Sequence, residues 1–243
     1  MGDAHGPLDP FAPTFPAPTA ARPLLGLTVL VVEDSRFACE AMRLLCLRSG
    51  ARIRRADCIR SARRHLQVYR PTVVIVDLGL PDGCGTQFIA ELVEAETTQS
   101  IVLAISGDTE REGEALAAGA QGFLGKPITS LAAFQQAVLS QLPADRRPSG
   151  LRVIENETIT PDEMAYHDDI SHAADILENL PNEHALDYLA QFLRGVARSA
   201  DDDPMVQAAH ALAARRADGG AAGSETARIA GLIQQRLAGK VAI

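Results

Sequence analysis

Five polar residues between positions 33 and 126 each follow or end a run of apolar residues. These residues are Glu33, Asp34, Asp77, Ser106 and Lys126. The longest of the apolar runs are Leu27–Val32, Val73–Val76 and Ile101–Ile105. Such runs are typical of strands that are buried on both faces of a parallel sheet. The carboxyl ends of these strands lie at one edge of the sheet, where α/β proteins bind ligands, so we expect the five side chains to meet there.

The types of these residues indicate phosphoryl transfer to a carboxylate. Three carboxylates at one sheet edge repel each other unless a hard cation neutralises them, and carboxylate oxygens suit Mg²⁺. An ammonium group and a hydroxyl group can offset charge on phosphoryl oxygens. Asp77 is then the in-line nucleophile. It needs no general base, because an ionised carboxylate already carries a free lone pair.

The elements that must position these residues alternate along the chain. The predicted strands are Leu27–Val32, Ala51–Ala56, Val73–Asp77, Ile101–Ile105 and Gln121–Leu124. The predicted helices are a segment from Phe37 that stops at Gly50, and the segments Ile59–Val68, Gln87–Glu94, Thr109–Ala118 and Leu131–Leu142. This order predicts an α/β fold of the (βα)5 type, a doubly wound parallel five-stranded sheet with helices on both faces.

Four motifs resemble those of the receiver domain of bacterial two-component response regulators, a flavodoxin-like fold. They are Val31-Val32-Glu33-Asp34, Val76-Asp77-Leu78-Gly79-Leu80-Pro81-Asp82-Gly83, Ala104-Ile105-Ser106-Gly107 and Gly122-Phe123-Leu124-Gly125-Lys126-Pro127. The resemblance covers residues 27–142. It implies a phosphorelay protein in which Asp77 accepts phosphate from a histidine kinase or a histidine phosphotransfer protein. Such a domain catalyses only its own phosphoryl transfer and dephosphorylation, so we do not expect an enzyme in the usual sense.

The same resemblance implies roles for the neighbouring residues. Glu33, Asp34, Asp77 and the backbone carbonyl of Gly79 would hold Mg²⁺. Ser106 and Lys126 would contact the phosphoryl group, and Phe123 stands where the family has an aromatic switch residue. The Lys126–Pro127 peptide bond is expected to be cis, a minority state that proline allows.

The remainder of the chain predicts an arm, a linker and a second unit. Residues 1–25 are rich in Pro and Ala and are expected to be a disordered arm ahead of a receiver domain at 26–143. Residues 144–159 read as a linker, and residues 160–243 as a small all-α bundle of four amphipathic helices. The predicted helices begin at the Thr160-Pro161-Asp162-Glu163 capping box, near Glu183, at Asp203-Pro204 and at the cap Ser224.

Composition and charge exclude some classes of protein. No apolar run reaches the roughly 20 residues that a membrane span needs, and the start of the chain lacks a signal-peptide pattern, so we expect a cytoplasmic protein. Residues 143–243 carry 10 Lys and Arg against 16 Asp and Glu, within a net charge of −8 for the chain. An acidic unit repels phosphates, so we expect no nucleic-acid partner, and a transcriptional regulator is the least favoured interpretation.

Two interpretations of the C-terminal unit stay open. In the first, its output is protein–protein contact with a downstream partner or a second copy of the chain. In the second, it passes phosphate through His210, because Ala208-Ala209-His210-Ala211-Leu212 is similar to the histidine phosphotransfer domain, whose motif is His-x-Leu-Lys-Gly. Here Ala213 and Ala214 stand where the motif has its Lys and its Gly.

Overall fold

A single five-stranded sheet forms the centre of the first half of the molecule. The computed structural model describes residues 17–95, 100–148, 157–179 and 184–239. The parallel strands are β1 (Thr28–Val32), β2 (Arg52–Ala56), β3 (Val73–Asp77), β6 (Ile101–Ser106) and β7 (Gly122–Gly125). Their order is β2-β1-β3-β6-β7, so the polar strand ends of β1, β3, β6 and β7 are neighbours. The predicted α/β fold is confirmed.

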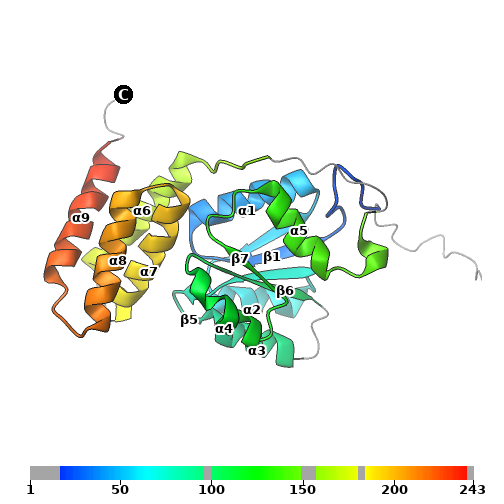
Figure 1. Cartoon of the computed structure of the whole chain (residues 1–243), viewed down its shortest axis with the longest axis horizontal. Helices are drawn as coiled ribbons and strands as arrows, with labels where there is room; N and C mark the ends of the chain where they lie inside the picture. The colour runs from blue at the N-terminus through cyan, green and yellow to red at the C-terminus, as the bar shows by residue number, and fades with distance from the viewer. Residues whose placement is uncertain (1–16, 96–99, 149–156, 180–183, 240–243) are drawn as a thin grey trace, which may run out of the picture.

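Helices cover both faces of this sheet (Figure 1). They are α1 (Arg36–Ser49), α2 (Ile59–Val68), α3 (Gly85–Glu94), α4 (Glu112–Ala117) and α5 (Leu131–Gln141). Alternate residues of each strand enter opposite cores. One core packs Val29, Val31 and Ile75 against α1 and α5. The other packs Leu30, Val32 and Val76 against α2, α3 and α4. Burial on both faces explains why the strands are continuous apolar runs.

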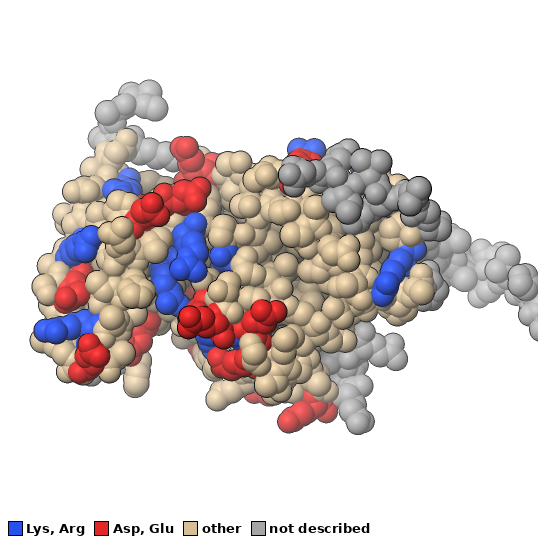
Figure 2. Space-filling view, viewed as in Figure 1, with Lys and Arg blue, Asp and Glu red and all other residues tan. Residues whose placement is uncertain are grey.

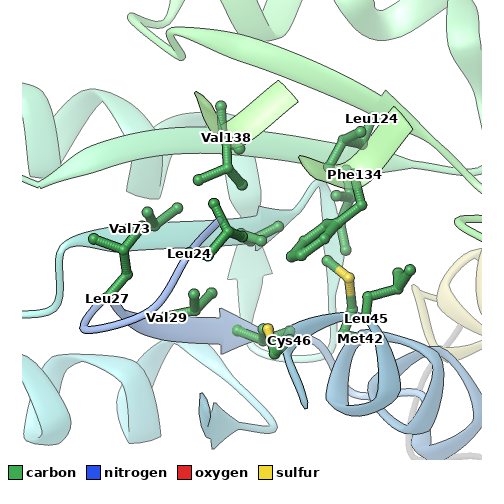
Figure 3. Packing of buried hydrophobic residues seen from close by; sticks show 14 of the residues in the cluster. Leu24, Leu27, Val29, Met42, Leu45, Cys46, Val73, Leu124, Phe134 and Val138 are labelled. Atoms are coloured by element: carbon green, nitrogen blue, oxygen red, sulfur yellow. The ribbon is translucent and has the colours of Figure 1, made fainter. Parts of the chain in front are cut away.

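The ordered α/β unit begins before residue 26. Leu24 is fully buried, and its backbone N–H donates to the carbonyl of Ser49 at 2.9 Å. Figure 3 shows Leu24 pointing into the core beside Phe134 and Val138. The arm expected at 1–25 is therefore shorter at its C-terminal end, because one leucine finds space between the sheet and its helices. Residues 1–16 lie outside the described residues.

Three local features differ from the prediction. The segment expected as a helix from Thr109 to Ala118 is a 3₁₀ turn, Thr109–Arg111, followed by the short helix α4. The loop after Asp77 contains a small antiparallel pair, β4 (Gly79–Leu80) and β5 (Gly83–Cys84). The end of the expected linker packs on the α/β unit, since Ile159 is buried in its core and its N–H bonds the carbonyl of Thr129. Residues 149–156 lie outside the described residues.

In the described part of the chain after residue 157, four helices form the second unit, called here the helical bundle. They are α6 (Glu163–Glu178), α7 (His184–Ser199), α8 (Asp203–Ala217) and α9 (Gly223–Ala238). They share a third apolar core that includes Ile170, Leu193 and Leu212. Two predicted caps are wrong: Asp162, not Thr160, caps α6, and Ser224 lies inside α9. The Asp162 carboxylate accepts a hydrogen bond from the N–H of Met164, so the helix is capped without the Thr160 side chain.

The bundle lies against one end of the α/β unit (Figure 1). Helices α6 and α7 pack against α1, and α7 also contacts β4. In Figure 2, basic and acidic side chains lie next to each other where the two units meet. Because β4 begins two residues after Asp77, this contact brings α7 to the polar strand ends.

Candidate functional site

The three predicted acids form one group at the carboxyl edge of the sheet. Glu33 and Asp34 follow β1, and Asp77 is the last residue of β3. One carboxylate oxygen from each of the three lies within 4.8 Å of the others. Glu33 is fully buried and Asp77 is 6% exposed, so water screens little of their repulsion. Strand order accounts for the grouping, because β1 and β3 are neighbours.

Lys126 partly neutralises these acids. Its ammonium Nζ lies 2.6 Å from Glu33 Oε2 and 3.3 Å from Asp77 Oδ1. Burial alone lowers the pKa of Lys126, but the carboxylates of Asp77, Glu33 and Asp34 raise it above its usual value. One ammonium against three carboxylates leaves two negative charges, and Glu33 Oε2 is buried without a hydrogen bond of good geometry among the described residues. The group therefore fits a divalent cation with oxygen ligands.

The imbalance of charge also alters the pKa values of the acids. Burial and then the charge of Glu33 raise the pKa of Asp77 to about 7, although Lys126 opposes the shift. Burial, Glu33 and Asp77 raise the pKa of Asp34 well above its usual value. Protons thus bind this site more tightly than they bind ordinary carboxylates. The same burial and excess negative charge that raise these pKa values also favour the binding of a cation.

The predicted hydroxyl and glycine lie in the same place. Ser106 ends β6, is 3% exposed and accepts a hydrogen bond from the N–H of Asp108 at 3.0 Å. Gly79 begins β4 and lines the same cavity as Asp77, Ser106 and Lys126. This cavity has a volume of about 20 Å³. The structure therefore brings together all five polar residues that the strand ends predicted, with Gly79 beside them.

Helix α7 closes this cavity, which the sequence did not predict. Its wall includes Gln191, Phe192, Arg194, Gly195 and Val196. The hydroxyl of Tyr188 donates a hydrogen bond to Asp34 Oδ2. Burial and then the charge of Asp34 raise the pKa of the Tyr188 phenol, which keeps it a donor. The helical bundle thus covers the edge of the sheet at which the three acids lie.

Two arginines of α7 fix the loop that follows Ser106. Arg194 pairs with Asp108 at 3.2 Å, and Arg198 donates to the backbone carbonyl of Gly107. The backbones come close at this point, because a Cβ added at Gly107 would lie 3.5 Å from the Cα of Gly195. The loops that carry the site residues therefore share a surface with α7.

A second helix of the bundle caps α1. Asp169 of α6 is 1% exposed and accepts hydrogen bonds from Ser35 Oγ at 2.7 Å, from Arg36 N at 2.8 Å and from Phe37 N at 3.0 Å. The N–H groups of a first helical turn have no partner within the helix, and a carboxylate there also meets the positive end of the helix dipole. Asp169 therefore ties the bundle to the segment that follows Glu33 and Asp34.

The two remaining predicted residues lie apart from this group. Phe123 of β7 is half-buried and packs against the core that faces α2, α3 and α4. His210 of α8 is exposed and is not among the residues that line the cavity. The expected cis bond at Lys126–Pro127 is present. Roles in switching and in phosphotransfer stay predictions for Phe123 and His210.

One signal in the sequence could have indicated α7. The spacing His-x-Leu-Lys-Gly recurs at 191–195 with Gln191 in place of the His, followed by Leu193, Arg194 and Gly195. A search that requires a histidine passes over this segment and selects His210. The structure places Gln191, not His210, beside the carboxylate group.

The fold and this site define a flavodoxin-like domain with three acids grouped at the carboxyl edge of its sheet. Comparison with known families identifies it: residues 29–138 match the response regulator receiver domain. This part of the chain is therefore a response regulator receiver domain.

Several curated relatives match the same part. The chain is 31% identical over 133 residues to the KDP operon transcriptional regulatory protein KdpE of Escherichia coli, covering 54% of this chain and 59% of KdpE. It is 32% identical over 132 residues to the virulence transcriptional regulatory protein PhoP of Salmonella typhimurium, covering 51% of this chain and 54% of PhoP. The chain thus matches little more than half the length of these relatives. Among solved structures, the Vibrio cholerae chemotaxis protein CheY4 is 25% identical, with a TM-score of 0.43, over 48% of this chain and 98% of that one.

The relatives do not agree with every expectation. KdpE and PhoP are named as transcriptional regulators, which does not fit the expectation of no nucleic-acid partner. Their similarity extends over about 130 residues, so it does not describe the helical bundle. None of the helices in the described part of the chain combines the length and the apolar character of a membrane span.

Proposed function

We propose that this chain is a phosphorelay response regulator in which Asp77 accepts a phosphoryl group from a histidine kinase or a histidine phosphotransfer protein. The observation that carries the proposal is the position of Asp77 between a buried ammonium and two further carboxylates, on the loop edge of a receiver domain. Buried charges that are only partly paired are costly, so their presence favours a role in chemistry over a role in stability.

The residues of the site divide the chemistry of transfer among them. An oxygen of the Asp77 carboxylate forms the new bond to phosphorus, while the bond from phosphorus to the donor's histidine nitrogen breaks and the imidazole leaves. Lys126 lies 3.3 Å from Asp77, within reach of a phosphoryl oxygen bound there. Ser106 supplies a hydroxyl that can donate to a second oxygen. Asp77 must be ionised to act as a nucleophile. Because burial raises its pKa to about 7, the ionised fraction of Asp77 changes with pH near neutrality.

Glu33, Asp34, Asp77 and the Gly79 carbonyl are the groups that would hold Mg²⁺. The ion would neutralise charge on the phosphoryl oxygens and on the carboxylates. The donor set fits it, because the three acids offer oxygen atoms within 4.8 Å of each other and carry two negative charges more than Lys126 offsets. The residues of the chain itself hold Asp77 at the end of β3 and keep the Lys126 ammonium beside it.

For the output we favour protein–protein contact of the helical bundle over DNA binding, in a cytoplasmic protein. The net negative charge of residues 143–243 supports this choice, because a surface that binds phosphates is normally basic. In this proposal the Phe123 side chain turns inward when Ser106 moves toward the phosphoryl group, and this changes the surface of the receiver near β7. A downstream protein, or a second copy of the chain, would read the change.

The experiment that tests the proposal is intact mass spectrometry of the full chain after treatment with Mg²⁺ and acetyl phosphate. We expect an adduct of one phosphoryl group that is lost in base, as acyl phosphates are. Asp77→Asn should abolish it, because the amide is nearly isosteric but is a poor nucleophile, and chelation of Mg²⁺ should prevent it. Labelling of Asp77→Asn at the rate of the native chain contradicts the proposal.

The same preparation tests the alternative that uses His210. A phosphorylated histidine phosphotransfer protein replaces acetyl phosphate as the donor. An adduct that is lost in acid and disappears in His210→Ala would show that the bundle passes phosphate on. A base-labile adduct alone leaves contact as the output of the bundle.

A further inference from the structure

We propose that α7 competes with magnesium and with a helical phosphodonor for one surface of the receiver, so that the chain keeps its own phosphoacceptor covered until the bundle moves away. The inference rests on the proposed function of Asp77. The surface consists of Asp34, Gly79, Gly107 and Asp108, which surround the mouth of the site.

The first support is that one face of α7 is devoted to this surface. Tyr188, Gln191, Arg194 and Arg198 follow one another at intervals of three, three and four residues, so they lie on one side of the helix. The other side carries Leu189, Leu193 and Val196 into the core of the bundle. The helix therefore has two buried faces, one toward its own bundle and one toward the receiver.

The second support is the size of the covered cavity. Its volume of about 20 Å³ has room for about one water molecule. A phosphoryl group with three oxygens needs more space, and a donor nitrogen must also approach Asp77 in line with the breaking bond. The side chain of Gln191 lies so close to Gly79 that a Cβ added there would overlap it. Phosphorylation of Asp77 thus requires α7 to move.

The third support is the bond between Tyr188 and Asp34. Asp34 Oδ2 accepts from the Tyr188 hydroxyl, and Asp34 is one of the three acids that can bind a cation. A cation bound to Asp34 draws electron density from the same carboxylate and makes it a weaker acceptor for the phenol. Binding of Mg²⁺ and docking of α7 are therefore linked, and each weakens the other.

The fourth support is that the donor must use the same surface. A donor histidine that approaches Asp77 from the side of Gly79 and Gly107 meets α7, because Gln191 and Gly195 line the cavity there. Arg194 and Arg198 hold the far side of the mouth through Asp108 and Gly107. A partner that carries a helix with similar polar residues would fit the surface once α7 has left it.

The test uses the full chain with the double substitution Tyr188→Phe and Arg198→Ala. Phe keeps the ring contact with Phe192, and Ala is a good helix former, so both changes spare the bundle. Removal of two anchors raises the fraction of open molecules, and the apparent affinity of a ligand rises in proportion. We expect acetyl phosphate to label Asp77 about fivefold faster, and Mg²⁺ to bind about threefold more tightly by calorimetry without a phosphodonor.

A matched control removes the same kinds of bond from inside the bundle. Tyr166 donates to Asp202 at 2.5 Å, and Arg216 pairs with Asp187 at 2.8 Å. Tyr166→Phe with Arg216→Ala therefore loses one phenol–carboxylate bond and one arginine–carboxylate pair within the bundle, while the ring at 166 keeps its edge contact with Phe37 of α1. This control should label and bind Mg²⁺ like the native chain. Hydrogen exchange at residues 188–198 of the native chain should increase when Asp77 is phosphorylated.

The outcomes separate the inference from the function on which it rests. Equal labelling rates and equal Mg²⁺ affinities in the native chain, the double variant and the control would overturn the competition while leaving Asp77 as the acceptor. A faster rate in the control alone, or unchanged exchange at 188–198 on phosphorylation, would overturn it as well. Failure to label any of the three proteins would overturn the proposed function and the inference together.

Discussion

The receiver and the helical bundle each bury a carboxylate, but the two are treated differently. Asp169 of the bundle accepts three hydrogen bonds from Ser35, Arg36 and Phe37. Asp77 of the receiver has Lys126 at 3.3 Å and shares this single ammonium with Glu33. The first carboxylate is satisfied by the fold, whereas the second belongs to a group that still lacks positive charge. A buried acid with all its bonds made serves structure, and one with a charge left over serves chemistry.

The substitution Lys126→Met tests the second half of this comparison and has the largest expected effect. It removes the ammonium and leaves the carboxylates of Glu33 and Asp77 buried without it. At pH 8 we expect a loss of about 3–5 kcal/mol in the free energy of unfolding, measured by urea denaturation. The loss should shrink at pH 5, where the carboxylates take up protons, and on addition of Mg²⁺. A loss that is the same at both pH values would show that charge is not the cause.

The substitution Asp169→Ala tests the satisfied carboxylate. It leaves the N–H groups of Arg36 and Phe37 and the hydroxyl of Ser35 without their partner at a buried helix start. We expect a loss of about 2–3 kcal/mol in the free energy of unfolding, together with faster hydrogen exchange in the first turn of α1.

The neighbouring residue provides a control for this change. Asp168 pairs with Arg36 at 2.8 Å, but the two side chains are 47% and 61% exposed. An exposed pair contributes little, so Asp168→Ala should cost less than about 0.5 kcal/mol. Equal losses in the two variants would mean that Asp169 does not act through its buried bonds.

The sequence predicted the chemistry of the receiver because the end of a buried strand can be recognised from a few neighbouring residues. Each apolar run ends at a polar residue, and a parallel sheet brings such ends together by geometry. The positions of Glu33, Asp77 and Lys126 thus follow from the order of the elements alone. The small pair β4 and β5 was missed, since two-residue strands have no period to detect.

The contact between the two units could not be predicted in the same way. The apolar positions of α7 indicated its side toward the bundle, and Leu189, Phe192, Leu193 and Val196 are indeed buried. Its other side carries Tyr188, Gln191, Arg194 and Arg198, a pattern that is equally typical of a solvated surface. Asp169 likewise has partners more than 130 residues away, which no local pattern reveals. Docking depends on the complementarity of two surfaces, and this property appears only when both have folded.

The substitution Asp77→Asn sharpens the comparison through its pH dependence. Burial raises the pKa of Asp77 from its usual value near 4 to about 7, so between these pH values the folded protein holds a proton that the unfolded chain has lost. The contribution of Asp77 to stability therefore falls as pH rises from about 4 to 7 and is constant above that range.

Three pKa units correspond to about 4 kcal/mol, and the cost of burying the amide offsets about half of this, so Asp77→Asn should be more stable than the native chain at pH 8 by about 2 kcal/mol and by clearly less at pH 5. Urea denaturation at the two pH values measures the difference. Mg²⁺ at pH 8 should reduce it, because the ion stabilises the native carboxylate and has less to bind in the variant. A variant that is less stable than the native chain at both pH values would mean that Asp77, like Asp169, is satisfied by the fold.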